Sequence, residues 1–401
     1  MKILIACKEF PHSRVIGGPI IIYNRVKYLS RNHLVSLVAF NHPGDEKYIP
    51  SMQPFCHDLR LIPLPPKRSP CKAMKDFFFS PVPHYFLRVY GSQEMSHTIA
   101  EMVKKDCYEA VVAEYSVMGQ FIHNNPLLPP VRKVISVHEC YYLARLKSYR
   151  HYNLGINKLR ETINLKGLKN FEFEMYRRAD KVLTLTPQGK KELLDISPDL
   201  DIAIVPHGVD VEDFAFSPEP EEKKSIVFVG NYLHHPNVDA VLHFHQNIWR
   251  LLKALVPDVK LYIVGQAPPP EITGLASDKS ITVTGRVKEV APYLRKCRIF
   301  ICPVRLGGGF RGKILEAMSV GRPVVSTTLG AEGIPVENTK NIIISDDPQS
   351  FAGSIAELIS DDSLFRDIQK NARALVENNY TWKKGVEVLE KVLQDVINKV
   401  P

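Results

Sequence analysis

One stretch decides the expected fold of this chain, and it reads Pro303-Val304-Arg305-Leu306-Gly307-Gly308-Gly309-Phe310-Arg311-Gly312-Lys313-Ile314-Leu315-Glu316-Ala317-Met318. Its glycines let main-chain N–H groups approach an anion closely, because glycine has no side chain. Arg305, Arg311 and Lys313 surround the glycines with positive charge that suits a phosphate or diphosphate. The carboxylate of Glu316 follows on a predicted helix, where it could accept hydrogen bonds from sugar hydroxyls.

A second glycine loop follows the first along the chain. Residues 321–327 form a turn into an apolar strand, and the loop Gly330-Ala331-Glu332-Gly333 comes next. The order strand, glycine loop, helix, strand, glycine loop builds a nucleotide-diphosphate site at the carboxyl edge of a parallel sheet. The alternative is that the glycines only make turns and the cations only solvate the surface. A glycine triplet, three cations and a carboxylate within residues 305–316 argue against that alternative.

The same stretch resembles the signature of retaining glycosyltransferases of the GT-B fold, in family four (glycosyl transferases group 1). That family commonly carries Glu-Gly-Phe-Gly, four further residues, and a second Glu followed by Ala. Here Gly308-Gly309-Phe310-Arg311 stands in the first place and Glu316 in the second, so Gly308 replaces the first Glu. A sub-branch with a triple glycine, an arginine and Lys-Ile-Leu-Glu-Ala-Met looks closer still. In the family the second Glu contacts the donor ribose, and loop N–H groups contact the transferred sugar.

The length of the chain indicates two domains. It has 401 residues, of which 45% are hydrophobic and 24% are charged, as in a globular protein. We expect an α/β protein with two Rossmann-like, doubly wound domains, which the resemblance places face to face across a central cleft. Residues 1–205 would bind the acceptor and residues 206–380 the nucleotide sugar, with a polar, proline-bearing seam at the boundary. The last helix, within 381–401, is expected to cross back to the first domain, as in GT-B enzymes.

Apolar strand-like runs alternate with amphipathic helices in both halves, which favours open parallel sheets with helices on both faces. In the first half we expect strands at 3–6, 34–40, 109–114, 131–138 and 181–186, and a helix at 19–30. In the second half we expect strands at 225–230, 259–265, 281–285, 299–303, 324–327 and 341–344, with long helices from 348.

Several features bear on location. The apolar run within residues 2–8 is too short for a signal peptide and is typical of a first strand. No segment approaches the roughly 18 uninterrupted apolar residues that a membrane span needs. The seven cysteines have no paired spacing, and their odd number argues against a disulfide framework. We expect a cytoplasmic protein, with the inner face of the membrane as a second possible location.

The net charge of +9 is concentrated in the first half. Residues 1–205 carry 29 Lys and Arg against 19 Asp and Glu, whereas residues 206–401 carry 23 against 24. This charge could attract anionic lipid head groups, a pyrophosphate-linked acceptor or nucleic acid, or it could serve solubility alone. No nucleic-acid-binding motif accompanies it, so nucleic acid is not an expected partner.

Residues 63–90 interrupt the α/β pattern. Cations there alternate with aromatic residues, including Phe77-Phe78-Phe79 and Tyr85-Phe86. Such a segment could make peripheral contact with a membrane, where rings enter the interface and cations meet head groups. The alternative is a helix pair that packs its Phe residues into the domain.

Three further positions belong to the expected site. Gly17 and Gly18 lie between the first strand and a helix, where N–H groups could face an anion, although a plain strand-to-helix turn explains them equally well. Gly230 ends the first strand of the second half. His138 ends the strand at 131–138, and residues at the carboxyl ends of parallel strands face the ligand. The family places a histidine here near the transferred sugar; the alternative is a capping or surface histidine.

No metal site is expected. His234 and His235 are adjacent and do not share a helix face, and no cysteine or carboxylate completes a ligand set around them. Asp199-Leu200-Asp201 has the Asp-x-Asp form that other glycosyltransferases use for divalent metals. It lies in a proline-flanked loop before a strand, which is typical of a turn.

The residues and the resemblance together predict a retaining glycosyltransferase of hexosyltransferase type (EC 2.4). It would move a sugar from a nucleotide diphosphate-sugar to a glycan, lipid-linked or small-molecule acceptor, with no metal and no cofactor beyond that co-substrate. The expected catalytic residues are His138, Arg305, Arg311 and Lys313. The expected donor-binding residues are Gly17, Gly18, Gly230, Gly307, Gly308, Gly309, Phe310, Glu316, Gly330, Ala331, Glu332 and Gly333. Two alternatives remain: a catalytically weak nucleotide-binding or scaffold protein, which the replacement at Gly308 suggests, and a GT-B nucleotide-sugar epimerase.

Overall fold

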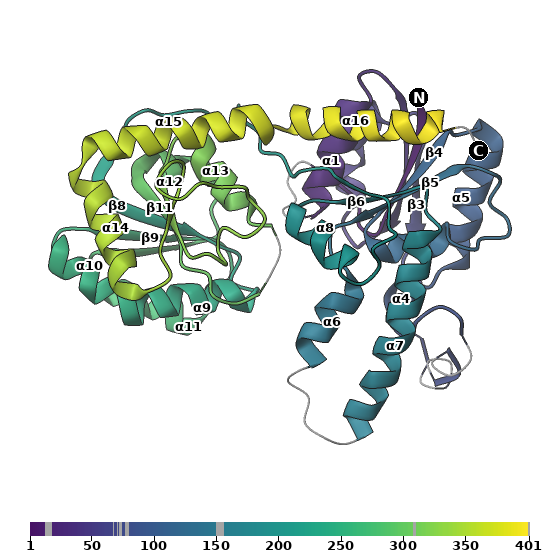
Figure 1. Cartoon of the computed structure of the whole chain (residues 1–401), viewed down its shortest axis with the longest axis horizontal. Helices are drawn as coiled ribbons and strands as arrows, with labels where there is room; N and C mark the ends of the chain where they lie inside the picture. The colour runs from purple at the N-terminus through teal and green to yellow at the C-terminus, as the bar shows by residue number, and fades with distance from the viewer. Residues whose placement is uncertain are drawn as a thin grey trace. The chain divides into compact units, whose positions relative to one another are not determined.

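A computed structural model describes residues 1–12, 18–66, 68–69, 71, 74–76, 80–149, 156–307 and 310–399. The chain divides into two compact units. The N-terminal unit consists of Met1–Val205 and Val386–Pro401, and the C-terminal unit consists of Pro206–Gly385. Each unit is built around its own parallel sheet and its own apolar core (Figure 1).

The N-terminal unit contains a seven-stranded sheet in the order β3-β2-β1-β4-β5-β6-β7. Its strands pair in parallel and are β1 (Lys2–Cys7), β2 (Leu34–Asn41), β3 (Leu59–Pro63), β4 (Ala110–Glu114), β5 (Arg132–Val137), β6 (Lys181–Thr184) and β7 (Ile202–Ile204). Its helices are α1 (Gly18–Leu29), α2 (Ile49–Met52), α4 (His84–Tyr90), α5 (Gln93–Asp106), α6 (Tyr141–Tyr149), α7 (Ile156–Arg177) and α8 (Pro187–Leu194). Most of α16 (Trp382–Asn398) also belongs to this unit.

The C-terminal unit contains a six-stranded parallel sheet in the order β10-β9-β8-β11-β12-β13. Its strands are β8 (Glu222–Val229), β9 (Lys260–Val264), β10 (Ile281–Gly285), β11 (Cys297–Cys302), β12 (Val324–Ser326) and β13 (Ile343–Ile344). Its helices are α9 (His235–His243), α10 (Arg250–Leu255), α11 (Pro270–Thr273), α12 (Ala291–Lys296), α13 (Gly312–Val320), α14 (Pro348–Ser360) and α15 (Asp362–Asn379). Helices α12, α13 and α15 lie on one side of this sheet, and α9, α10 and α11 on the other (Figure 1).

The strand orders show why ligands are expected at one edge of each sheet. In both sheets the chain first winds outward and then returns beside its starting strand, so β1 neighbours β4 and β8 neighbours β11. Such a switch point leaves a gap between neighbouring connections at the carboxyl ends of the strands. The predicted α/β class with two Rossmann-like, doubly wound domains is confirmed.

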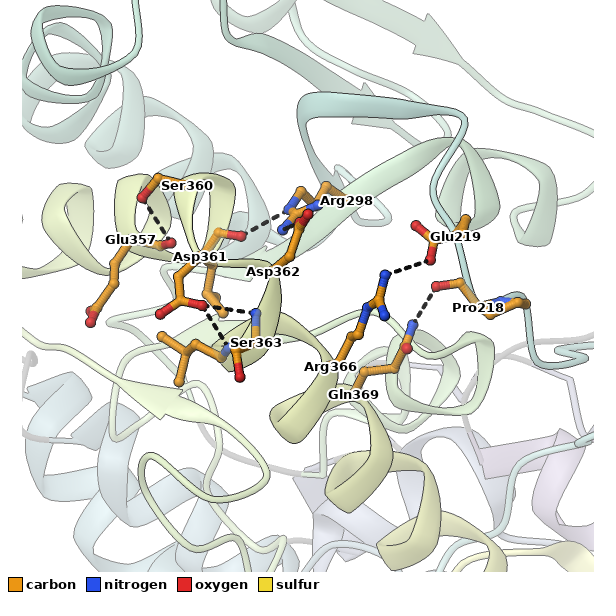
Figure 2. Close-up of polar contacts among 12 residues, drawn as sticks. Pro218, Glu219, Arg298, Glu357, Ser360, Asp361, Asp362, Ser363, Arg366 and Gln369 are labelled. Atoms are coloured by element: carbon orange, nitrogen blue, oxygen red, sulfur yellow. Dashed lines mark hydrogen bonds and ion pairs between the residues drawn. The ribbon is translucent and has the colours of Figure 1, made fainter.

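The opposite edge of the C-terminal sheet is closed by a set of polar contacts around the start of α15 (Figure 2). Arg298, at the amino end of β11, is 1% exposed and donates to the carbonyl of Leu358 at 2.8 Å and to Asp362 at 2.6 Å. The Asp361 carboxylate caps α15, accepting from two main-chain N–H groups of its first turn. Gln369 donates to the carbonyl of Pro218 at 2.9 Å, which attaches α15 to the segment that leads into β8.

The strand β3 was not predicted, and β7 was anticipated only as the strand that follows the Asp-x-Asp loop, without bounds. The first lies directly before the cation- and aromatic-rich segment, and the second has only three residues beside a proline-flanked loop. The strand predicted at 181–186 ends at Thr184, because the side chain of Thr186 accepts a hydrogen bond from Gly189 and caps α8.

The segment at 63–90 is partly buried. Phe86 of α4 is fully buried, with its ring 5.4 Å from that of Tyr141 and 5.8 Å from that of Phe171. This ring therefore packs into the unit, as in the alternative we gave for the segment. Phe77, Phe78 and Phe79 lie outside the described residues. Among the helices that the structure describes, none has the length and apolar character needed to cross a bilayer.

Candidate functional site

Helix α13 carries two ionisable side chains at the carboxyl edge of the C-terminal sheet. The loop that leads into this helix starts directly after β11, whose neighbour in the sheet is β8. Lys313 lies in the first turn of α13 and Glu316 one turn later, so the spacing places both side chains on the same side of the helix. The helix ends at Gly321, which adopts the left-handed conformation (φ +86°) that glycine accepts at this position.

Lys313 is bound to the C-terminal unit without a carboxylate partner. Its Nζ donates to the carbonyl of Val229 at 3.0 Å and to Oδ1 of Asn237 at 2.9 Å, and it lies 4.2 Å from the centre of the Phe228 ring. Burial lowers the pKa of this ammonium to about 8. Two neutral acceptors and an aromatic face hold the cation in place but do not neutralise it.

Glu316 is likewise left without direct compensation. Burial raises the pKa of its carboxyl group to about 7, an effect that the charge of Lys313 opposes only in part. Among the described residues, none donates a hydrogen bond to its side chain. A carboxylate and an ammonium whose pKa values both move toward neutrality, on one side of one helix, are typical of a functional site.

The two predicted arginines differ in their surroundings. Arg305 is 53% exposed and forms two hydrogen bonds with the carboxylate of Asp239, at 2.8 and 2.9 Å. A phosphate at Arg305 would therefore share this guanidinium with Asp239. Arg311 directly precedes α13, at the N-cap position of the helix. Its position next to the amino end of a helix favours an anion there.

The first glycine loop is described only in part, because Gly308 and Gly309 lie outside the described residues. Gly307 adopts a left-handed conformation (φ +79°), and a Cβ there would lie 3.1 Å from the side chain of Pro236. Phe310 stacks on the ring of His207 with 5.0 Å between the ring centres. These contacts place the two ends of the loop against the body of the C-terminal unit.

Three main-chain N–H groups of the second glycine loop donate to acceptors close by in the sequence. The N–H of Gly330 donates to Oγ1 of Thr327, that of Ala331 to the carbonyl of Thr327, and that of Glu332 to the carbonyl of Leu329. A diphosphate would have to compete with these hydrogen bonds. Gly333 adopts φ +84°.

Gly230 directly follows β8 in the sequence. A Cβ at Gly230 would lie 3.1 Å from the side chain of Asn237, which accepts a hydrogen bond from Lys313.

A buried charge cluster lies at the carboxyl edge of the N-terminal sheet. Glu114, the last residue of β4, is fully buried and accepts two hydrogen bonds from Nη1 of Arg25, at 2.7 and 2.8 Å. The same nitrogen donates to Oγ of Ser136 at 2.8 Å. Burial by itself would raise the pKa of Glu114, but Arg25 and His138 outweigh it and lower the pKa to about 2. Glu114 is therefore ionised at neutral pH.

His138 joins this cluster through one ring nitrogen. Its Nε2 lies 2.8 Å from Oε2 of Glu114, and burial lowers the pKa of the imidazole below its usual value. Because ionised Glu114 can only accept, the neutral imidazole carries its proton on Nε2. The other nitrogen, Nδ1, is buried and has no hydrogen-bond partner among the described residues. It is therefore an acceptor that a ligand hydroxyl could satisfy.

Tyr115 explains why glycine stands at position 18. Tyr115 has φ +73°, an uncommon conformation for a residue with a side chain, and its ring lies 4.3 Å from that of His138. Its hydroxyl oxygen lies only 1.8 Å from where a Cβ of residue 18 would be, so any larger residue there would require the Tyr115 side chain to move. Gly17 lies outside the described residues. The sequence reasoning missed Arg25, Glu114 and Tyr115, although an acidic residue that ends the apolar run 110–113 is a signal for the second.

Within the described parts of the chain, no group of three or more His, Cys, Asp and Glu side chains is arranged to hold a metal ion. Asp201, in the Asp-x-Asp motif, is paired with Lys181 and with Lys399, the latter at 2.9 Å. Asp199 accepts a hydrogen bond from Ser197 at 2.6 Å. These two carboxylates thus serve local contacts of the N-terminal unit.

The comparisons with known proteins point to the same half of the chain as the geometry. Residues 223–361 match the family glycosyl transferases group 1. The phosphatidyl-myo-inositol mannosyltransferase of Mycolicibacterium smegmatis is 28% identical over 206 residues, which cover 49% of this chain and 52% of that protein. The chain spans about half the length of the curated relatives it matches.

The solved structures extend the likeness to the whole fold. Sucrose-phosphate synthase from Thermosynechococcus elongatus has a TM-score of 0.70 at 17% identity and covers 99% of both chains. HepE from Anabaena, in complex with UDP, has a TM-score of 0.69 at 16% identity, covering 98% of this chain and 100% of that one. At these identities the likeness shows the fold alone. The predicted GT-B fold is confirmed.

Proposed function

We propose that this protein is a glycosyltransferase that takes a sugar from a nucleotide diphosphate-sugar and transfers it with retention of the anomeric configuration. The observation that carries the proposal is the pair Lys313 and Glu316, two under-compensated charges of opposite sign on the same side of α13. They lie in the segment that matches glycosyl transferases group 1. A nucleotide diphosphate-sugar supplies what each of them lacks, namely an anion for the first and hydroxyl donors for the second.

The proposed chemistry starts with the leaving group. When the bond between the sugar and the diphosphate breaks, negative charge develops on the nucleoside diphosphate. Lys313 and Arg311 would stabilise that charge, and fixed charges in a buried site act strongly on developing charge. Arg305 would contribute where the phosphate displaces part of its contact with Asp239. These cations can supply the stabilisation without a metal ion, so we propose a metal-independent reaction.

Glu316 would bind the nucleoside. Its carboxylate, ionised above a pKa of about 7, can accept hydrogen bonds from both ribose hydroxyls. Those hydrogen bonds favour the charged form, and the diphosphate favours the charged form of Lys313. Binding of the donor therefore stabilises both ions, which the empty site holds at a cost.

His138 would position the transferred sugar. Its unprotonated Nδ1 accepts a hydrogen bond from a sugar hydroxyl, while Glu114 and Arg25 hold the ring and its tautomer. In this role His138 contacts the substrate and the other two are positioning residues. We propose no protein nucleophile. The departing phosphate would instead help to deprotonate the acceptor hydroxyl as the new glycosidic bond forms on the same face of the sugar.

The comparisons support a nucleotide-sugar donor and leave several acceptors open. The Anabaena structure contains UDP, and the Mycolicibacterium relative is by name a mannosyltransferase that acts on phosphatidyl-myo-inositol. We propose by analogy that this chain uses a nucleotide diphosphate-sugar and transfers a hexose to a glycan, lipid-linked or small-molecule acceptor.

A thermal-unfolding screen tests the donor site. Purified protein is heated with UDP, GDP, ADP and their common sugar conjugates, each with and without a chelator. A ligand at about a hundred times its dissociation constant stabilises the fold by about 2.7 kcal/mol, which is readily detected. We expect a response to one nucleotide that the chelator does not change. A folded protein that responds to none would contradict the proposal, and a response that the chelator abolishes would contradict metal independence.

A turnover assay tests the reaction itself. The nucleotide sugar identified by the screen is incubated with the protein and a mixture of glycan and lipid-linked acceptors, and the product is analysed by NMR. Transfer with the anomeric configuration of the donor is the expected result. An inverted product would contradict retention, and an epimerised donor without transfer would favour the epimerase alternative.

A further inference from the structure

Two segments of the N-terminal unit hold the whole excess charge of the chain. Residues 63–90 and 141–170 together contain twelve Lys and Arg but only two Asp and Glu, a net charge of +10. The whole chain contains 52 Lys and Arg against 43 Asp and Glu, so all other residues together carry a net charge of −1. The positive charge is thus not spread over the protein, as a role in solubility alone would favour.

The two segments pack together in space. Helices α6 and α7, from the second segment, lie beside α4, from the first (Figure 1). Tyr85 of α4 donates to Glu161 of α7 at 2.7 Å, and Arg145 of α6 donates to the same carboxylate at 2.9 Å. The guanidinium of Arg145 also lies 4.4 Å from the centre of the Tyr85 ring. We call residues 63–90 and 141–170 the basic lobe.

Both acidic residues of the basic lobe form hydrogen bonds or ion pairs with other residues of the lobe. Glu161 is 4% exposed and is shared between α4 and α6. Asp76 forms an ion pair with Arg68, which also donates to the carbonyl of Leu87 in α4. The exposed charged residues in the described part of the lobe are therefore cations, although Glu192, outside the lobe, lies 3.7 Å from Lys147.

The outer side of α7 combines these cations with exposed apolar side chains. Leu159 and Ile163 are 64% and 54% exposed, and their spacing places them on one face of the helix. Arg160, Lys166 and Lys169 are also exposed. On the other segment Met74 is 62% exposed, next to exposed Lys75. Exposed aliphatic side chains beside exposed cations, with no exposed acidic residue among them, are suited to bind an anionic, amphipathic surface.

The basic lobe begins at the edge of the sheet where the candidate site lies. Its first segment leaves the carboxyl end of β3, and its second segment starts three residues after His138, at the carboxyl end of β5. The N–H groups of Tyr141 and Tyr142, at the start of α6, both donate to buried Glu172, at 3.0 and 2.8 Å. The lobe is therefore attached firmly to the same edge as Glu114 and His138.

We propose that the basic lobe docks on the surface of a bilayer that contains anionic lipids. Leu159 and Ile163 enter the interface, and Arg160, Lys166 and Lys169 meet the phosphate groups. The exposed aliphatic pair favours a lipid surface over nucleic acid, because single-stranded nucleic acid is typically bound by stacking on aromatic rings. Docked in this way, the carboxyl edge of the N-terminal sheet faces an acceptor held in the membrane.

A vesicle-flotation assay tests this docking. The full chain is mixed with vesicles of phosphatidylcholine alone or of phosphatidylcholine with phosphatidylglycerol. We expect flotation with the anionic vesicles only, and weaker binding as salt rises, because the Debye length falls from about 10 Å at 0.1 M to about 3 Å at 1 M. The assay uses no nucleotide, so its failure would leave the donor-site proposal untouched.

Matched variants assign the binding to the lobe. The triple change Arg160→Glu, Lys166→Glu and Lys169→Glu should weaken binding at least on the order of a hundredfold, since each cation near an anionic surface contributes about fivefold. The control carries the same charge change at exposed helical lysines outside the lobe, Lys104→Glu, Lys370→Glu and Lys391→Glu. It should still float. If the triple variant does not fold, variants with Gln in place of Glu at the same positions replace both the triple variant and its control.

A separate variant tests the apolar part of the surface. Leu159→Ser with Ile163→Ser removes exposed side chains only, so the fold should be retained. At high salt, where the charge attraction is screened, this double variant should bind the anionic vesicles several-fold more weakly than the wild type. The proposal is overturned if the wild type binds neither vesicle, if it binds both equally, or if the triple variant and its control lose binding alike. Preference for duplex DNA over the anionic vesicles would also overturn it.

Discussion

The two ends of the C-terminal sheet hold their charged side chains in opposite ways. At the amino end of β11, Arg298 is paired with Asp362 at 2.6 Å and caps the carbonyl of Leu358 (Figure 2). Beyond the carboxyl end, the hydrogen-bond acceptors that the described residues offer to Lys313 are neutral, and none of these residues donates to Glu316. Burial lowers the pKa of Lys313 to about 8 and raises the pKa of Glu316 to about 7.

We infer from this difference that Arg298 has a structural role and that Lys313 and Glu316 have a functional one. A buried cation with partners stabilises the packing around it, whereas a buried ion without a counterion costs free energy and is retained only where something else requires it. Arg298, at the amino end of the sheet, therefore attaches α15, and we propose that Lys313 and Glu316, beyond the carboxyl end, bind a ligand. The changes at Arg298, Lys313 and Glu316 each act on one end of this sheet and should leave the other unaffected, and a fourth change tests the N-terminal sheet.

The largest expected effect is on stability, at the amino end. Arg298→Met keeps the volume but leaves the carbonyl of Leu358 without its donor, so the free energy of unfolding should fall by about 2–3 kcal/mol. Urea denaturation of the full chain measures this. The nucleotide affinity of the folded variant should equal that of the wild type. A large change in affinity with unchanged stability would reverse the assignment of the two ends.

The next effect is on binding, at the carboxyl end. Lys313→Met removes the cation proposed to contact the diphosphate, and a lost charge-assisted hydrogen bond of about 1.5–3 kcal/mol weakens binding about tenfold to a hundredfold. Calorimetric titration with the nucleoside diphosphate that the screen identifies should show this loss. Stability should change little, because relief of the buried charge offsets two lost hydrogen bonds.

The nucleoside without phosphates is the control ligand for Lys313→Met. Its affinity should be unchanged. Equal losses for nucleoside and nucleoside diphosphate would contradict the assignment of Lys313 to the phosphates.

Glu316→Gln should stabilise the protein while it weakens binding of the nucleoside. The pKa of Glu316 in the fold, about 7, lies above its ordinary value of 4.5, so the fold favours the protonated form. Stability from this group is present at low pH and is lost as pH rises through about 7. The variant should therefore unfold at a temperature a few degrees higher than the wild type at pH 8, a gain of about 1–2 kcal/mol.

Thermal unfolding of both proteins across pH checks this prediction. The difference between them should shrink as the pH falls toward 4.5, because both side chains are then uncharged. A variant that is less stable than the wild type at pH 8 would mean that Glu316 is a structural residue.

The smallest effect concerns His138 in the N-terminal sheet. Glu114 there is paired with Arg25 and His138, but Nδ1 of His138 has no hydrogen-bond partner among the described residues. In Glu114→Gln, Arg25 can only donate, so it keeps the amide oxygen and turns the NH2 group toward His138. The imidazole proton should then move from Nε2 to Nδ1, which turns the proposed sugar acceptor into a donor. We expect about a tenfold loss of turnover, the equivalent of one hydrogen bond.

Nitrogen-15 NMR of histidine-labelled protein detects the tautomer directly. The wild type should show Nδ1 unprotonated, and Glu114→Gln should show the reverse. Ser136→Ala is the control, because it removes one contact of Arg25 and leaves Glu114 beside His138. The same tautomer in wild type and Glu114→Gln would contradict the positioning role.

Much of the fold could be predicted from the sequence because the strands are continuous apolar runs between turn residues. β1 and β11 are fully buried or nearly so, which leaves a clear signal. For β7 the sequence indicated a strand after the Asp-x-Asp loop but not its bounds, since Ile-Ala-Ile is too short to show a pattern. Lys313 and Glu316 could be found because they are close in sequence. Arg25, Glu114 and His138 come together from α1, β4 and the end of β5, and no local pattern records that contact.

Hydrogen–deuterium exchange of the full chain, with and without the nucleotide diphosphate-sugar identified by the screen, tests the central claim most directly. Ligand binding slows exchange where it suppresses local opening. We predict protection in peptides that cover residues 303–318, and none in peptides that cover residues 358–369. Protection around the start of α15, with unchanged exchange at α13, would contradict the account.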